Sequence, residues 1–305
     1  MTATEATEHD RAGDATAPAP GATPPRTPAL PAKAAAELVG TAALVAVVVG
    51  SGIQATELTK DVGLQLLANS TATVFGLGVL IALLGPVSGA HFNPVITLAE
   101  WWTARRGGAG VTLREAAVYV PAQVAGAIAG AVLADAMFGE PLVKWSTHDR
   151  SAGHLLLGEV VATAGLILLI FGLARTDRLR FAPVAVASYI GAAYWFTSST
   201  SFANPAVTIG RAFTDTFAGI APSSVAGFIG MQIVGAVIGL ALVALVFMPG
   251  RLMPPQAGKT YPDAQHVAEL DQHHHGRVHP RCPGHPARGH EPHGPAAQEG
   301  ATGRQ

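Results

Sequence analysis

Cysteine and charge are both scarce in this sequence. Cys282 is the single cysteine among 305 residues, so no disulfide can form within one chain. Asp, Glu, Lys and Arg together make up only 13% of the residues, and the formal net charge is -1. The sequence lacks the excess of basic residues that is typical of nucleic-acid-binding proteins, so we expect no nucleic-acid partner.

Long apolar runs are missing from both ends of the chain. Residues 1–32 are rich in Ala, Pro and Thr and have no apolar core like that of a signal peptide. Residues 249–305 hold eight of the twelve histidines, including His273, His274 and His275, but without a fixed ligand spacing. We interpret both segments as disordered tails and predict no metal site and no cofactor.

Apolar segments fill the region between the tails. The mean hydropathy is +0.35, and a membrane span requires about 20 mostly apolar residues. Candidate spans cover residues 34–53, 64–84, 116–137, 155–174, 181–196 and 225–247. We therefore expect an all-α, multi-pass membrane domain over residues 33–248, with six transmembrane helices.

One short motif occurs twice among these spans, as Asn93-Pro94-Val95 and as Asn204-Pro205-Ala206. Asparagine is a strong helix N-cap and proline is tolerated in the first helical turn, so each copy predicts the start of a helix. A helix that starts inside the apolar region is a re-entrant half-helix, whose positive dipole end points at whatever lies before it. We expect the half-helices to cover residues 94–102 and about 205–217.

The two halves of the domain, about residues 33–137 and 152–248, repeat each other. Glu37 and Glu159 lie in similar segments of the first and fourth spans. Gln123 and Gln232 lie in similar segments of the third and sixth spans. Because each half has three spans, the second half enters the membrane inverted. Inverted repeats with broken helices have their site at the repeat interface, near the middle of the membrane.

The repeated glutamates and glutamines are candidate loop supports. A buried carboxylate can accept hydrogen bonds from the unpaired N–H groups of a re-entrant loop, and we favour this role for Glu37 and Glu159. The alternative is a proton relay, because a carboxylate inside a membrane is costly and is a functional candidate. Gln123 and Gln232 either brace the same loops or form bonds between helices.

Basic residues in the short loops predict the orientation. Two loops are rich in arginine, and their residues are Arg105, Arg106 and Arg114 in the first and Arg175, Arg178 and Arg180 in the second. Cytoplasmic loops carry an excess of Lys and Arg. Both loops lie on one side of a six-span protein. We therefore expect that side and both termini to be cytoplasmic, in a protein of the plasma membrane.

With its Asn-Pro motifs set between inverted repeats, the chain resembles the aquaporin, or major intrinsic protein, family of channels over about residues 33–248. The resemblance implies a right-handed bundle of six spans and two half-helices, assembled as a homotetramer with one pore per subunit. It also implies that Asn93 and Asn204 meet at the middle of the pore. There the amides would donate to the permeating molecule, and both helix dipoles would oppose cations.

Two positions depart from the family pattern. Val95 replaces the usual alanine of the first motif, and Val207 replaces the arginine that directly follows the second. In the family, that arginine forms an outer selectivity filter with three other residues. Counting without gaps puts those positions at Thr73, Ser201 and either Ala192 or Gly191. These side chains are small and uncharged, so we expect an unusually wide filter.

Two further features are candidates for narrowing the outer pore. Arg211 follows Val207 by four residues and shares its helix face. It either reaches the pore mouth or caps loop carbonyls, and we favour the second role. The cluster Tyr194-Trp195-Phe196 either narrows the vestibule or belongs to an aromatic belt at the membrane interface, and we favour the belt.

These features together predict a passive channel for water and small uncharged solutes such as glycerol-like polyols. Bacterial family members that lack the filter arginine resemble those associated with arsenic handling, so neutral metalloids such as arsenicals are also candidate solutes. The alternatives are a proton-coupled carrier that uses Glu37 and Glu159, and a non-conducting junction or scaffold protein. The spans contain no nucleophile–base arrangement, so we do not expect an enzyme.

Overall fold

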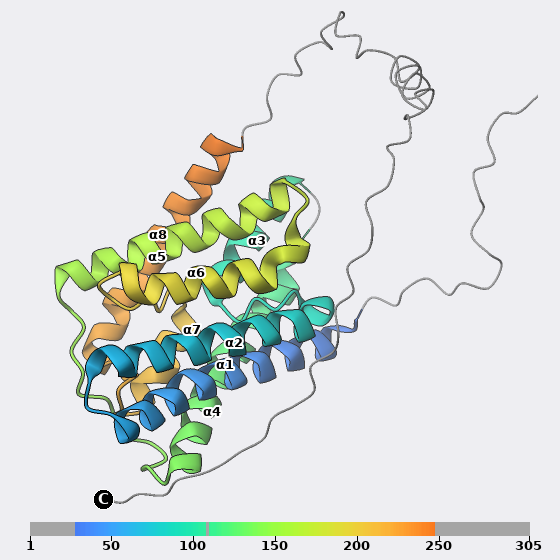
Figure 1. Ribbon diagram of the computed structural model, residues 1–305. Coiled ribbons are helices and arrows are strands. Elements are labelled where there is room, and N and C mark those ends of the chain that lie inside the picture. The colour runs from blue at the N-terminus through green and yellow to red at the C-terminus, as the bar shows by residue number, and fades with distance from the viewer. Residues whose placement is uncertain (1–27, 108–109, 248–305) are drawn as a thin grey trace, which may run out of the picture. The chain divides into compact units, whose positions relative to one another are not determined.

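The computed structural model describes residues 28–107 and 110–247, which fold into helices joined by loops (Figure 1). The elements in chain order are α1 (Leu30–Leu58), α2 (Val62–Ser88), α3 (Pro94–Gly107), α4 (Leu113–Phe138), α5 (Gly153–Arg175), η1 (Leu179–Phe181), α6 (Ala182–Phe196), α7 (Pro205–Gly210), η2 (Arg211–Phe213) and α8 (Pro222–Val246). Apart from residues 28–32, the predicted tails lie outside the described residues. α1 begins three residues before the predicted domain boundary, because Pro31 is tolerated in its first turn.

Five of the described helices are long and apolar enough to cross a membrane, namely α1, α2, α4, α5 and α8. The remaining predicted span is α6, which has 15 residues and is therefore about 22 Å long. The short 3₁₀ helix η1 directly precedes α6 and lengthens the segment. α6 contacts both α5 and α2 and lies between them in Figure 1.

Polar and apolar residues are distributed as in a membrane protein. Large apolar side chains such as Phe75, Val79 and Val237 are more than 60% exposed on the long helices. Glu37 and Glu159, in contrast, are completely buried. An apolar exterior around a buried polar interior suits a lipid environment, where backbone and side-chain polar groups must be satisfied inside the protein.

The two repeats pack through equivalent helix crossings. A Cβ atom on Gly130 of α4 would collide with the carbonyl group of Ala42 in α1. A Cβ atom on Gly239 of α8 would lie 2.7 Å from the carbonyl oxygen of Ala164 in α5. Small residues at such crossings let two backbones approach closely. The half-helices α3 and α7 both contact α4 and α8, so the crossings position the loops that precede them.

The second half-helix is shorter than expected, because η2 ends at Phe213 rather than near residue 217. Gly210 lies against the backbone carbonyl of Ala127, where a side chain would collide. Thr214 then adopts an extended conformation, and its hydroxyl donates to the buried carboxylate of Asp135 at 2.8 Å. These contacts of α4 turn the chain away from the helical path.

Candidate functional site

Each Asn-Pro motif begins a half-helix, with α3 starting at Pro94 and α7 at Pro205. The Oδ1 atom of Asn93 accepts a hydrogen bond from the N–H group of Val95 at 3.1 Å. The Oδ1 atom of Asn204 accepts from two N–H groups in the first turn of α7, at 3.0 and 3.2 Å. Both asparagines therefore use their carbonyl oxygen as the cap, and their amide nitrogens remain available for other partners.

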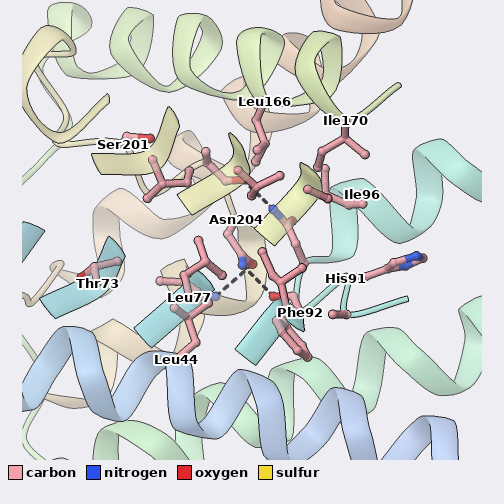
Figure 2. A pocket seen from close by; sticks show the side chains of 18 of the residues that line it. Leu44, Thr73, Leu77, His91, Phe92, Ile96, Leu166, Ile170, Ser201 and Asn204 are labelled. Carbon is pink, nitrogen blue, oxygen red and sulfur yellow. Dashed lines mark hydrogen bonds between the residues drawn. The ribbon is translucent and has the colours of Figure 1, made fainter. Parts of the chain in front are cut away.

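The amide nitrogens join the two loops at the centre of the bundle. The Nδ2 atom of Asn93 donates to the carbonyl oxygen of Ala203 at 2.8 Å. In the same way, the Nδ2 atom of Asn204 donates to the carbonyl oxygen of Phe92 at 2.7 Å, as Figure 2 shows. Each amide has a second N–H group, and both asparagines line the central cavity. The positive ends of both half-helices are thus held face to face.

Glu37 supports the loop before α3. Its carboxylate accepts from the N–H groups of His91 and Phe92 at 3.0 and 2.7 Å. It also accepts from the Ser88 hydroxyl at 2.6 Å and from Gln123 Nε2 at 2.7 Å. Phe92 has a positive φ of 47°, a conformation that costs energy in a non-glycine residue. The bonds to Glu37 offset part of this cost and satisfy N–H groups that have no partner in a helix.

Glu159 supports the second loop in the same way. Its carboxylate accepts from the N–H groups of Phe202 and Ala203 at 2.9 and 2.8 Å, and from Gln232 Nε2 at 2.7 Å. Ala203 also has a positive φ, of 48°. Glu37 and Glu159 do not belong to the lining of the cavity. This arrangement favours a bracing role over a proton relay, because a relay requires contact with the transport path.

Two threonines complete the support, and sequence reasoning missed them. Gln123 Nε2 donates to the Thr97 hydroxyl, and Gln232 Nε2 donates to the Thr208 hydroxyl, both at 2.9 Å. Each threonine hydroxyl in turn donates to the carbonyl oxygen of the asparagine four residues earlier, at 3.2 and 2.8 Å. The signal was present in the sequence, since threonine follows the asparagine by four residues in both motif copies.

A cavity of about 290 Å³ passes the two asparagines (Figure 2). Its walls are mostly aliphatic, with Leu44 and Leu77 on one side of Asn204 and Leu166 and Ile170 on the other. Polar groups lie at the asparagines and at the two ends. We call these ends the Glu100 end, where His91 and Glu100 line the cavity, and the Arg211 end, with lining residues Thr73, Tyr194, Ser201, Phe202 and Arg211.

The predicted filter residues are only partly brought together. Thr73, Ser201 and Val207 line the cavity, whereas Ala192 is exposed and Gly191 does not belong to the lining. Counting without gaps was therefore wrong for α6. This helix continues to Phe196, and its inward face carries residues four positions apart, Ile190 and Tyr194.

Tyr194 provides the largest correction to the expected filter. Its hydroxyl lies 3.2 Å from the hydroxyl of Thr73, and either group can be the donor. Its neighbours Trp195 and Phe196 are 52% and 56% exposed, as expected for residues of an aromatic belt. The three aromatic residues therefore divide, with one at the cavity and two on the exterior.

Arg211 corrects the expectation of an uncharged lining. Its side chain is buried, yet it belongs to the cavity wall. Its Nε atom donates to the carbonyl oxygen of Ala218, and its Cζ atom lies 3.4 Å from the centroid of the Phe202 ring. Arg211 thus combines the two roles that the sequence left open, because it caps a loop carbonyl and also reaches the cavity.

The Glu100 end has a histidine and a carboxylate in contact. His91 Nε2 lies 2.7 Å from a carboxylate oxygen of Glu100, and His91 Nδ1 lies 3.0 Å from the Thr97 hydroxyl. The imidazole ring also packs against the ring of Tyr119 in a T-shaped arrangement. Among the described residues, no group of three or more His, Cys, Asp or Glu side chains is suited to hold a metal ion.

These loops, their buried supports and the cavity define an all-helical membrane protein with an inverted repeat and a central pore. A sequence profile of the major intrinsic protein family matches residues 26–201. Aquaglyceroporin AqpS of Rhizobium meliloti is 49% identical over 216 residues, which are 71% of this chain and 90% of that protein. The chain therefore belongs to the major intrinsic protein family.

Further relatives agree with this assignment. Human aquaporin-2 is 38% identical over 116 residues, and the match covers 36% of this chain and 40% of that protein. The crystal structure of the aquaglyceroporin from Plasmodium falciparum shares the fold, with a TM-score of 0.50 and 19% identity. That match covers 72% of this chain and 97% of that structure. The expected all-α channel fold is confirmed, and so is the expectation of a membrane channel rather than an enzyme.

Proposed function

We propose that this protein is a passive channel for water and small uncharged solutes of the size of glycerol. The observation that carries the proposal is the single cavity that extends from the Glu100 end to the Arg211 end and passes both Asn93 and Asn204. AqpS, which is 49% identical, is described as an aquaglyceroporin. The similarity covers 90% of AqpS and 71% of this chain.

The cavity suits neutral solutes because its walls differ in polarity. Aliphatic side chains contact the carbon atoms of a polyol, while the asparagine amides donate to its oxygen atoms. An ion would lose most of its hydration without gaining a counter-charge in this middle section. The positive ends of α3 and α7 add a barrier against cations. Water and polyols therefore pass, and cations are excluded.

We assign the selectivity filter to Thr73, Tyr194, Ser201 and Val207, with Arg211 one helical turn beyond Val207. An arginine at position 207 would narrow the cavity and offer donors to solutes, and valine does neither. The filter then discriminates weakly by size, so glycerol and neutral metalloid hydroxides such as trivalent arsenicals are proposed as solutes. Tyr194 also limits the width, because its ring lines the cavity in place of the small residue that was expected from α6.

Osmotic assays in proteoliposomes test this proposal. Vesicles that contain the protein are mixed with hypertonic glycerol, urea or arsenite, and light scattering follows the shrinkage and reswelling. We expect rates that rise linearly with the solute gradient and do not change when a proton gradient is imposed. Saturable, proton-driven uptake would favour the carrier that uses Glu37 and Glu159. The absence of solute flux from well-folded protein would favour a non-conducting scaffold.

The remaining assignments follow from the family and from the loop charges. We propose a homotetramer in the plasma membrane, with both termini and the arginine-rich loops in the cytoplasm. The Glu100 end then faces the cytoplasm and the Arg211 end faces outward. We further propose that residues 1–32 and 249–305 contribute little to conduction, so that deletion of residues 256–305 leaves water flux unchanged. Protease access from either side of sealed vesicles tests the orientation.

A further inference from the structure

Two guanidinium groups approach the ring of Phe202 at the Arg211 end. The Cζ atom of Arg211 lies 3.4 Å from the ring centroid, and that of Arg150 lies 5.1 Å from it. Each group is anchored through its Nε atom, since Arg211 donates to the carbonyl of Ala218 and Arg150 donates to the carbonyl of Gly219. The terminal nitrogens of both groups remain available for other acceptors.

Positive charge exceeds negative charge around this ring. In the described ranges, neither Arg150 nor Arg211 has a carboxylate within 4.0 Å. Glu159 is close enough to interact electrostatically with both. Its oxygens, however, already accept three hydrogen bonds from the loop and Gln232. Two guanidinium groups and one carboxylate therefore leave an excess of one positive charge.

A second unpaired group points to a ligand at the same place. The hydroxyl of Ser201 is buried and has no hydrogen-bond partner among the described residues, although Ser201 lines the cavity. Arg211 is only 4% exposed and lines the same end. A buried donor without an acceptor costs free energy, and a buried charge without a counter-charge costs more. An anion with several acceptor oxygens would relieve both costs.

The cavity beyond this point cannot carry an anion. Between the Arg211 end and the asparagines, the cavity wall is aliphatic and is formed by Val207, Leu77, Leu166 and Ile190. These side chains offer no hydrogen-bond donor. An anion would have to lose its hydration to enter this section, which is strongly unfavourable. A bound anion would therefore stay at the Arg211 end and occupy the path of neutral solutes.

We propose that the Arg211 end binds a small planar oxyanion of the nitrate or carboxylate class, held by Arg211 and Ser201, and that the bound anion obstructs neutral-solute flux. A planar oxyanion matches the fork of donors on a guanidinium group. Arg150 contributes charge at longer range. The proposal rests on the proposed channel function for its flux readout, but the binding site itself does not depend on conduction.

Nitrate is a suitable probe, because it is planar and does not form a neutral acid that crosses the bilayer at neutral pH. Glycerol flux is measured in proteoliposomes in sodium nitrate and in sodium chloride, at equal ionic strength. We expect saturable inhibition by nitrate relative to chloride. In Arg211→Gln and in Ser201→Ala, the concentration for half inhibition should rise by about tenfold and about threefold, respectively, since a charged donor contributes more than a neutral one. Protein-free vesicles provide the baseline.

Arg180→Gln is the matched control. The Arg180 guanidinium also lies over an aromatic ring, at 4.8 Å from the centroid of Phe181, but it follows Leu179, which lines the cavity away from the Arg211 end. This variant should keep the full nitrate effect. Equal flux in nitrate and chloride, or inhibition that is unchanged in Arg211→Gln, would overturn the proposal.

Thermal unfolding separates failure of the site from failure of the channel. In detergent, nitrate should raise the Tm of the parent protein above its value in chloride, because a ligand that binds the folded state stabilises it. The shift should shrink in Ser201→Ala, a substitution small enough to preserve folding, and should also shrink in Arg150→Gln. A rise in Tm with nitrate in a protein that shows no glycerol flux would support the anion site and refute the proposed channel. Glycerol flux without any rise in Tm would support the channel and refute the anion site.

Discussion

The loops before the two half-helices share one hydrogen-bonding frame but differ in the groups they bring to the cavity. Alignment of Asn93 with Asn204 pairs His91 with Phe202 and Glu100 with Arg211. His91 and Glu100 form a close pair at 2.7 Å, whereas Phe202 lies under the guanidinium of Arg211. The backbone supports are equivalent in the two halves, whereas the side chains at the two ends of the cavity differ: a histidine beside a carboxylate at one end and a guanidinium over a phenyl ring at the other.

This difference shows which residues must be the same in both halves of the repeat and which can vary. The groups that hold the loops are Glu, Gln and Thr in both halves, because each loop has two N–H groups that a helix cannot satisfy. The residue pairs at the cavity ends bond only to backbone groups that follow the half-helices, since Glu100 accepts from the N–H group of Val111 and Arg211 donates to the carbonyl of Ala218. They are therefore free to differ, and selectivity can be set separately at each end.

The largest effect should come from removing a loop support. Glu37→Leu and Glu159→Leu each leave two buried N–H groups unpaired, at about 1–3 kcal/mol per group. We expect both variants to misfold, with Glu37→Leu the more severe, because Glu37 accepts four hydrogen bonds and Glu159 accepts three. Size-exclusion chromatography in detergent measures the folded fraction.

Glu159→Gln is the control for this comparison. An amide oxygen can still accept from the loop, so a folded but less stable protein is expected. If Glu159→Leu folded and conducted normally, and lost only a pH dependence, the bracing role would be wrong and the proton relay would gain support.

The second-largest effect is expected from a substitution of Val207 in the proposed filter. Val207→Arg would place a further guanidinium four residues before Arg211 and narrow the cavity. Glycerol flux should fall by about tenfold or more and water flux much less, because selection in a pore depends on its width and on the donors that line it. Arg211→Ala in the parent should instead raise glycerol flux. Equal proportional loss of water and glycerol flux in Val207→Arg would contradict the proposed filter.

A smaller effect is expected at the opposite end. His91→Phe copies Phe202 and removes the contacts of the imidazole with Thr97 and Glu100, which should destabilise the protein by about 1–2 kcal/mol. Glu100→Gln should cost less than about 1 kcal/mol, because the Glu100 side chain is 35% exposed and water screens the pair. Detergent unfolding curves give both values. A larger loss in Glu100→Gln than in His91→Phe would show that charge, rather than the ring, holds this end.

The smallest effect is expected at a loop contact near the Arg211 end. The N–H group of Thr147 and the ammonium group of Lys144 lower the pKa of Asp215 from its usual 3.8 to about 2. A lowered pKa means that the ionised carboxylate stabilises the folded state above pH 4, and that this contribution disappears as the pH falls toward 2. Asp215→Asn should therefore lower the Tm slightly at pH 7, with the difference from the parent narrowing below pH 4. A difference that does not depend on pH would exclude this explanation.

Much of the fold was predictable because its signals are local. The Asn-Pro starts depend on capping chemistry within one turn, and the spans depend on apolar length. α6 shows the limit of this reasoning. Counting from the motif selected Ala192, but the path of residues 197–203 between α6 and Asn204 sets the alignment, and helix rotation puts Tyr194 at the cavity instead.

The sequence by itself determined the inverted repeat, the two half-helix starts and the candidate supports Glu37, Glu159, Gln123 and Gln232, because capping, apolar length and the cost of a buried carboxylate can be read from local segments. Only the tertiary structure decided which side chains meet at the Arg211 end. Arg211, Ser201 and Tyr194 come from a 3₁₀ turn, a loop and a separate helix. Their distances depend on how α7 ends against α4, a long-range packing contact that no local pattern encodes.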